Sequence, residues 1–254
     1  MIRKNRKYIF AATLGFIIFC SVAVFVYFSE KEVDLLISID MPMPTDCAGM
    51  YNVADYVVVG RYGSMTGTMN ASRDPQDISK ESEDEYFENR IYEFFPCAVV
   101  KGNVDAERIS ISRPYSETRE IMTALGKDNL KTYDPFFYEP DTGKTYMLFL
   151  KYDKYFDLYY AAAEPFTIEL SENGEASLVT NLISPDFTSR VNQRVTSSRG
   201  RTVNVALEYG TTSYEDKVSG LDYTELLEKM NVLPERVKIK NGGEAIQYLN
   251  QSEK

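Results

Sequence analysis

Residues 144–152 read Lys-Thr-Tyr-Met-Leu-Phe-Leu-Lys-Tyr, the most apolar of the short β-type runs in the chain. A run of this length, rich in aromatic and aliphatic side chains, predicts a buried strand at the centre of a sheet. The sequence Glu-Asn-Gly-Glu at 172–175 predicts a hairpin turn. Further β segments surround that turn and the central run, at residues 158–163, 166–170 and 176–180.

Three more β segments precede the central run, at residues 56–62, 91–100 and 108–113. The first is β-branched and aromatic throughout, and the third alternates strictly before Pro114. Pro96 lies inside the second, which predicts an edge or a bulge there. The stretch 63–89 interrupts this pattern with glycines and an acidic run, which predicts a solvated loop rather than a calcium site. This many short strands separated by turns favour an antiparallel barrel or sandwich.

Two segments carry helix signals. Ser116 as N-cap and Gly126 as terminator predict a short helix over 116–125. Asp222 with Glu225 forms a capping box, which predicts a second helix over 222–230. Before the second helix, 182–201 is polar and predicts a loop, and 202–209 predicts a further strand. After it, 244–249 predicts only a weak helical segment.

Residues 8–28 are 21 consecutive residues without a charged side chain, and they follow four basic residues. As a helix this run is about 30 Å long, the thickness of a bilayer core. Because positive charge stays on the cytoplasmic side, we expect a single-pass plasma-membrane protein with its N-terminus inside and the remaining chain outside the cytoplasm. A cleaved signal peptide ending near Ala23 is the alternative, although the apolar run continues past that point.

Composition excludes several activities. The 254 residues include 28 Lys and Arg, 38 Asp and Glu, and no histidine. Histidine-dependent triads and histidine-type zinc sites are therefore excluded, and the acidic excess is not typical of nucleic-acid binding. Ser79-Lys80 lacks the orientation that catalysis requires, and no carboxylate pair is framed by a motif. We therefore expect no enzyme, no catalytic residue, no bound metal and no cofactor.

Cys47 and Cys97 are the two cysteines of the expected extracytoplasmic part. One disulfide between them is possible there, since that environment lets such bonds persist. Two buried free thiols are the alternative, and the sequence leaves both open.

The segments Ala-Asp-Tyr-Val-Val-Val-Gly at 54–60, Cys-Ala-Val-Val-Lys-Gly at 97–102 and Gly-Lys-Thr-Tyr-Met-Leu-Phe-Leu at 143–150 follow one another in order. That order resembles a group of poorly characterised, membrane-attached extracytoplasmic bacterial proteins with an OB-like barrel. More distantly it is similar to the netrin module and the tissue inhibitors of metalloproteinases. The resemblance covers residues 47–180 and implies fold and compartment. It does not imply the inhibitors' activity, because Cys47 is not at an N-terminus.

Two aromatic-rich stretches flank the central run and form a candidate recognition patch. Its members are Tyr133, Phe136, Phe137, Tyr138, Tyr152, Tyr155, Phe156 and Tyr159. Packing of the barrel core and ends is the alternative role for these rings.

The predicted fold is mainly β: an N-terminal transmembrane helix, then an antiparallel OB-like β-barrel with one or two C-terminal helices. The division is a cytoplasmic tail at 1–7, a transmembrane helix at 8–28, a stalk at 29–50, a barrel at 51–180 and an extension at 181–254. The expected function is a non-enzymatic binding module that recognises a protein or a cell-envelope component. An accessory subunit that assembles through residues 8–28 is the second hypothesis, and a carboxylate-dependent hydrolase is the third.

Overall fold

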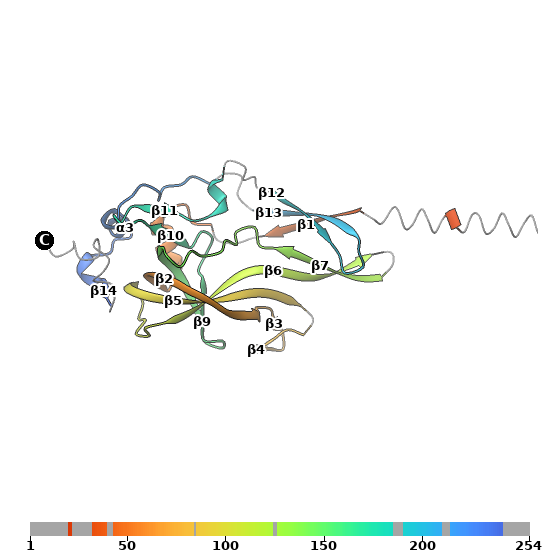
Figure 1. The fold of residues 1–254 in the computed structure, drawn as a ribbon, viewed down its shortest axis with the longest axis horizontal. Coiled ribbons are helices and arrows are strands. Elements are labelled where there is room, and N and C mark those ends of the chain that lie inside the picture. The colour runs from red at the N-terminus through yellow and green to blue at the C-terminus, as the bar shows by residue number, and fades with distance from the viewer. Residues whose placement is uncertain are drawn as a thin grey trace, which may run out of the picture.

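The computed structural model of the protein describes residues 20–21, 32–39, 43–83, 85–123, 126–184, 190–209 and 214–240. Within these ranges the fold is mainly β with two short α-helices (Figure 1). The expected tail at 1–7, the segment 244–249 and all of the run 8–28 except Cys20 and Ser21 lie outside the described residues. None of the helices in the described part is long and apolar enough to cross a membrane.

A large, mainly antiparallel sheet forms the body of the molecule, and in the described residues it has nine strands. Seven of them follow one another in the order β11-β10-β8-β2-β5-β6-β7, while β14 pairs with β5 and β9 pairs with both β6 and β8. Their bounds are β2 Tyr56–Asn70, β5 Tyr86–Lys101, β6 Ile109–Thr123, β7 Gly126–Tyr133, β8 Thr145–Asp153, β9 Leu158–Ala161, β10 Thr167–Leu170, β11 Ala176–Leu178 and β14 Lys238–Ile239.

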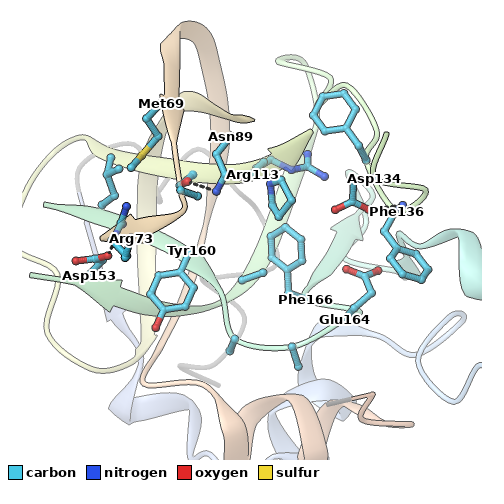
Figure 2. Close-up of a pocket in the computed structure, with 18 residues that line it drawn as sticks. Met69, Arg73, Asn89, Arg113, Asp134, Phe136, Asp153, Tyr160, Glu164 and Phe166 are labelled. Atoms are coloured by element: carbon cyan, nitrogen blue, oxygen red, sulfur yellow. Dashed lines mark hydrogen bonds and ion pairs between the residues drawn. The ribbon is translucent and has the colours of Figure 1, made fainter. Parts of the chain in front are cut away.

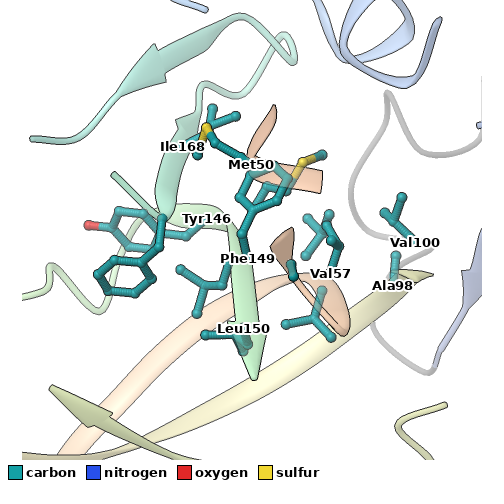
Figure 3. Close-up of a cluster of buried hydrophobic side chains, with 14 of the residues drawn as sticks. Met50, Val57, Ala98, Val100, Tyr146, Phe149, Leu150 and Ile168 are labelled. Carbon is teal, nitrogen blue, oxygen red and sulfur yellow. The ribbon is translucent and has the colours of Figure 1, made fainter. Parts of the chain in front are cut away.

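The prediction of a buried central strand at 144–152 is confirmed by β8. It lies between β10 and β2, and its residues from Thr145 to Leu150 are all buried. Phe149 and Leu150 pack with Met50, Val57 and other side chains in one apolar core (Figure 3). Packing on both faces buries residues 145–150 of β8, which explains the apolar run there.

The sheet is not a closed barrel, because its outer strands β11 and β7 do not pair with each other. The strand β9 crosses the gap between β8 and β6: it pairs antiparallel with β8 and, over two residue pairs, parallel with β6. Pro96 lies opposite Gly60 at a register shift, so the predicted bulge is confirmed. A Cβ on Gly60 would lie 2.2 Å from the carbonyl oxygen of Phe95, so this close approach requires glycine.

A second sheet has three strands in the order β1-β13-β12: β1 Glu32–Ile39, β13 Thr202–Tyr209 and β12 Arg190–Thr196. β1 and β13 are parallel although their sequences are far apart. Val203, Val205 and Leu207 of β13 pack with Leu130 of β7 and with Phe136 in a second apolar core. Figure 1 shows this sheet beside β7, and α3 and β14 toward the other end of the long axis. The strand predicted at 202–209 is therefore confirmed, and it joins the N-terminal and C-terminal parts of the chain.

The predicted helix over 116–125 is wrong. β6 continues through Pro114 to Thr123, paired with β5 on one side and with β7 on the other. Ser116 does not cap a helix; its hydroxyl donates to the Glu88 carboxylate at 3.0 Å. Residues 116–118 pair on both sides and residues 119–123 pair with β7, and these backbone hydrogen bonds outweigh the local helix signals.

Two segments expected to be loops, and the expected stalk, in which residues 33–39 could form a strand, contain strands or helix. The stretch 63–89 holds the end of β2, the start of β5 and a small hairpin of β3 (Arg73–Asp74) and β4 (Asp77–Glu81). The stretch 182–201 holds β12. The expected stalk at 29–50 holds β1 and the start of helix α2 (Cys47–Val53), whose Cys47 and Met50 are buried in the main core.

The helix predicted at 222–230 is confirmed as α3 (Tyr223–Lys229). The Glu225 N–H donates to the Asp222 side chain, and the Asp222 N–H donates to the Glu225 carboxylate, both at 2.8 Å. The turn predicted at 172–175 is also confirmed, since β10 and β11 pair across it and Gly174 has a φ of +84°. Two short 3₁₀ turns complete the described elements, at Asn181–Ile183 and Pro234–Arg236.

Candidate functional site

A cavity of about 500 Å³ opens beside β5, β6 and β9. Two loop segments complete its wall, one at 134–137 and one at 162–166. Its volume lies within the range of about 300–1,000 Å³ that holds small organic ligands. We call it the main cavity.

The polar side chains of the main cavity gather in two places (Figure 2). Asp134 and Glu164 lie together on one side, with Arg113 next to them, while Arg73 and Asp153 lie on the other side. Phe166 lies between the two groups, and alanines 161–163 also contribute to the wall. The cavity therefore combines an apolar surface with a few convergent polar groups, which is typical of binding sites.

Arg113 comes from the middle of β6. Ile109 and Ile111 of the same strand are buried, and the period of two places Arg113 on their face of the strand. Only 2% of Arg113 is exposed. Its guanidinium lies over the ring of Tyr138 at 3.9 Å and within 5.5 Å of the Phe137 and Phe166 ring centres. A full positive charge is thus enclosed by aromatic rings at the wall of the cavity.

Glu164 is 6% exposed, and its Oε1 accepts a hydrogen bond from the Thr180 hydroxyl at 2.7 Å. Burial, together with the neighbouring charge of Asp134, raises the pKa of this carboxyl to about 8, against the opposing effects of Thr180 and Arg113. Asp134 accepts from the Phe136 N–H at 2.8 Å. Burial raises the pKa of Asp134 to about 6, although that hydrogen bond and Arg113 oppose the change. Near neutral pH, Glu164 is therefore mainly protonated.

The opposite side of the cavity is held by an ion pair. An Arg73 Nη2 donates to the Asp153 carboxylate at 2.9 Å, and the same guanidinium lies 3.6 Å from the ring centre of Phe156. Asn89 donates to the Ser112 hydroxyl at 2.8 Å within the same wall. The ion pair and the hydrogen bond give these polar side chains partners, so this side of the cavity carries no net charge.

A second cavity of about 300 Å³ lies between β6, β7 and the three-stranded sheet. Tyr133, Leu207 and Glu117 contribute to its wall, and Asp134 and Phe136 line both cavities. The loop at 134–136 therefore separates the two spaces.

The predicted aromatic patch forms two clusters. Tyr133 and Phe137 contact the ring of Tyr115, whereas Tyr152 and Tyr159 contact each other and Tyr56. Tyr133, Tyr152 and Tyr155 are exposed and Phe136 is buried. Phe136 and Phe137 line the main cavity, while Tyr138 and Phe156 contact its arginines. Recognition by the exposed tyrosines stays a prediction.

Cys47 and Cys97 are free thiols in the structure, and both are buried. The disulfide that the sequence left open is therefore not formed, and the alternative of two buried thiols describes this structure. Burial raises the pKa of Cys97 to about 11, against its hydrogen bonding to the backbone and the charge of Arg61. Such a thiol is unreactive at neutral pH.

Sequence reasoning did not identify Arg113, Asp134 or Glu164. One signal for Arg113 was present, since the alternation of residues 108–113 places it on the same face as two isoleucines. No comparable signal marks the two acids, because their burial depends on loops that fold against distant strands.

No family model, curated protein or solved structure matches this chain. The resemblance to membrane-attached extracytoplasmic proteins therefore stays a prediction.

Proposed function

We propose that the chain is a non-enzymatic binding module, tethered to the membrane by residues 8–28, whose folded part lies outside the cytoplasm and recognises a component of the cell envelope. The observation that carries this proposal is the main cavity, with its apolar wall and its few polar groups. The tether rests on the uncharged run and the basic residues before it.

An OB-like organisation is part of the same proposal. It is supported by the ring of pairings from β2 to β5, β6, β9, β8 and back to β2, in which only β6 and β9 are parallel. OB-type barrels bind ligands with the strand faces and loops of such a ring. All five of these strands contribute residues to the wall of the main cavity.

The test is a small-fragment screen by ligand-observed NMR on the full-length chain, with a variant that fills the cavity. Ala71 is half-buried and lines both cavities, so Ala71→Phe should occupy their shared wall. Ala106→Phe at an exposed position is the matched control. We expect fragments that bind the wild type and the control, and at least a tenfold loss of affinity in Ala71→Phe. A screen without hits, or hits unaffected by Ala71→Phe, contradicts the proposal.

A carboxylate-dependent hydrolase is a second candidate, favoured by one observation. Asp134 and Glu164 line the same cavity, and their pKa values are raised to different levels, about 6 and about 8. Carboxyl pairs whose pKa values differ in this way serve as base and acid in hydrolases. A panel of chromogenic glycosides and esters, assayed from pH 5 to 9 with Asp134→Asn and Glu164→Gln, separates the two candidates: turnover lost in both variants favours the hydrolase.

A further inference from the structure

The guanidinium of Arg113 is a buried charged group at the wall of the main cavity. Its Nη1 is buried without a hydrogen-bond partner, and no hydrogen bond or ion pair joins the Arg113 side chain to any other described residue. Contacts to the rings of Tyr138, Phe137 and Phe166 attract the charge but accept none of its N–H groups in ordinary hydrogen bonds. Burial of a cation without a hydrogen-bonded anion lowers the stability of the fold, and a bound anion would offset that loss.

The neighbouring acids do not supply a hydrogen-bonded partner for the guanidinium. Neither Asp134 nor Glu164 forms an ion pair with Arg113. The charge of Arg113 only partly opposes the rise in the pKa of both acids that burial causes. Asp134 accepts the Phe136 N–H, and Glu164 accepts the Thr180 hydroxyl. The fork of N–H donors on Arg113 is therefore available at the cavity wall.

We infer that Arg113 binds the carboxylate of a small organic acid, or of a carboxylate-bearing end of a larger molecule, whose apolar body lies against Phe166 and alanines 161–163. This inference rests on the proposed binding function and names its ligand class. A planar carboxylate matches the guanidinium fork with two parallel hydrogen bonds.

The surroundings of Arg113 favour a single negative charge over a phosphate. A dianion would lie near two acidic side chains, whereas a carboxylate adds one charge, which Arg113 neutralises. A protonated Glu164 can also donate a hydrogen bond to the ligand. The ion pair of Arg73 with Asp153 leaves the opposite side without net charge, so it does not compete for the carboxylate.

Three probes of one shape test the inference by calorimetry on the full-length chain at pH 7: phenylacetate, phenylacetamide and phenethylamine. We expect phenylacetate to bind the wild type at least tenfold more tightly than the amide or the amine. In Arg113→Met, which keeps the side-chain volume, phenylacetate and phenylacetamide should bind within twofold of each other. Arg108→Met removes an exposed arginine outside the cavity and should keep the wild-type preference.

Arg113→Lys keeps the charge without the fork, and we expect an intermediate preference. If Arg113→Met does not fold, the three-probe comparison on the wild type and Arg113→Lys still decide the question. Equal or tighter binding of the amide or amine, lost in Ala71→Phe, overturns the carboxylate inference and leaves the binding function standing. No binding by any probe or library fragment overturns both.

Discussion

Two buried acids of this protein have opposite surroundings. Asp128 in β7 is 3% exposed and accepts four hydrogen bonds: from the hydroxyls of Ser197 and Ser198 and from the N–H groups of Asn129 and Arg199. Glu164 at the main cavity is almost as buried and accepts one hydrogen bond, from Thr180.

The pKa values of the two groups reflect this difference. Burial raises the pKa of Asp128, but the hydrogen bonds from Ser198, Ser197 and the backbone outweigh it, so the pKa lies below its ordinary value. Burial dominates at Glu164 and raises its pKa to about 8. The four donors around Asp128 stabilise its charge at the junction of β7 with the β12–β13 turn, whereas Glu164 has one donor and keeps its proton to a higher pH.

The largest effect is expected from Asp128→Ala. Removal of the carboxylate takes away the acceptor that two hydroxyls and two backbone N–H groups share, and it removes the ion pair with Arg201 at 3.9 Å. We expect a loss of about 3–5 kcal/mol in the free energy of unfolding, measured with urea at pH 7. A loss under about 1 kcal/mol would mean that this cluster is not structural.

The same chemical change at both acids should give opposite signs. Glu164 keeps its proton in the folded chain up to about pH 8, whereas the ordinary value is 4.5. The folded state therefore holds more protons than the unfolded state in this window, and stability falls as pH rises through it. Glu164→Gln removes the ionisable group and with it this loss of stability. The variant should therefore melt higher than wild type at pH 8, and its melting temperature should rise less at pH 5.

The matched variant is Asp128→Asn, which should melt lower than wild type at pH 8. In the wild type, the Asp128 carboxylate stabilises the fold above the ordinary pKa of aspartate, and that contribution is lost as pH falls through the lowered pKa of the folded state. A gain of about 1 kcal/mol at Glu164 corresponds to roughly 2–4 °C in melting temperature for a chain of this size. The same sign for both variants contradicts the comparison.

Smaller effects separate the individual donors. Ser198→Ala removes a 2.7 Å hydrogen bond to a charged carboxylate and should cost about 1.5 kcal/mol in urea unfolding. Thr180→Val removes the donor of a mainly protonated Glu164 and should cost less than about 1 kcal/mol at pH 7. A larger loss from Thr180→Val than from Ser198→Ala would reverse the assigned roles of the two regions.

The smallest change in stability is expected from Arg113→Met. The substitution removes a buried cation that has no ion pair and keeps the packing volume, so the unfolding free energy should stay within about 1 kcal/mol of wild type or rise. Thermal unfolding at pH 7 checks this expectation. A drop of several kcal/mol would assign Arg113 to the scaffold and not to a ligand site.

The sequence predicts the elements that depend on nearby residues better than those that depend on distant strands. Strands with strong local patterns, such as β8 and β13, and the helix after Asp222 are determined by nearby residues, and all were predicted. The extension of β6 past Pro114 was not predicted, because it depends on pairing with β5 up to Thr118 and with β7 up to Thr123. The parallel pairing of β1 with β13 joins distant segments, and no residue pattern within either segment indicates it.

The candidate site was predictable only in part. The aromatic stretch before β8 was identified, and Phe136 and Phe137 line the main cavity. Asp134 and Glu164 lie in loops without an apolar period, so their burial follows only from the folded arrangement. Arg113 alone carried a signal, through its register with Ile109 and Ile111.

The most direct test of the difference between the two acids is a carbon-13 NMR titration of the side-chain carboxyls, with Asp128 and Glu164 assigned by their amide variants. We predict that Asp128 titrates below its ordinary value of 3.8 and that Glu164 titrates near 8. A Glu164 carboxyl that titrates near 4.5, as an exposed glutamate does, would contradict the account.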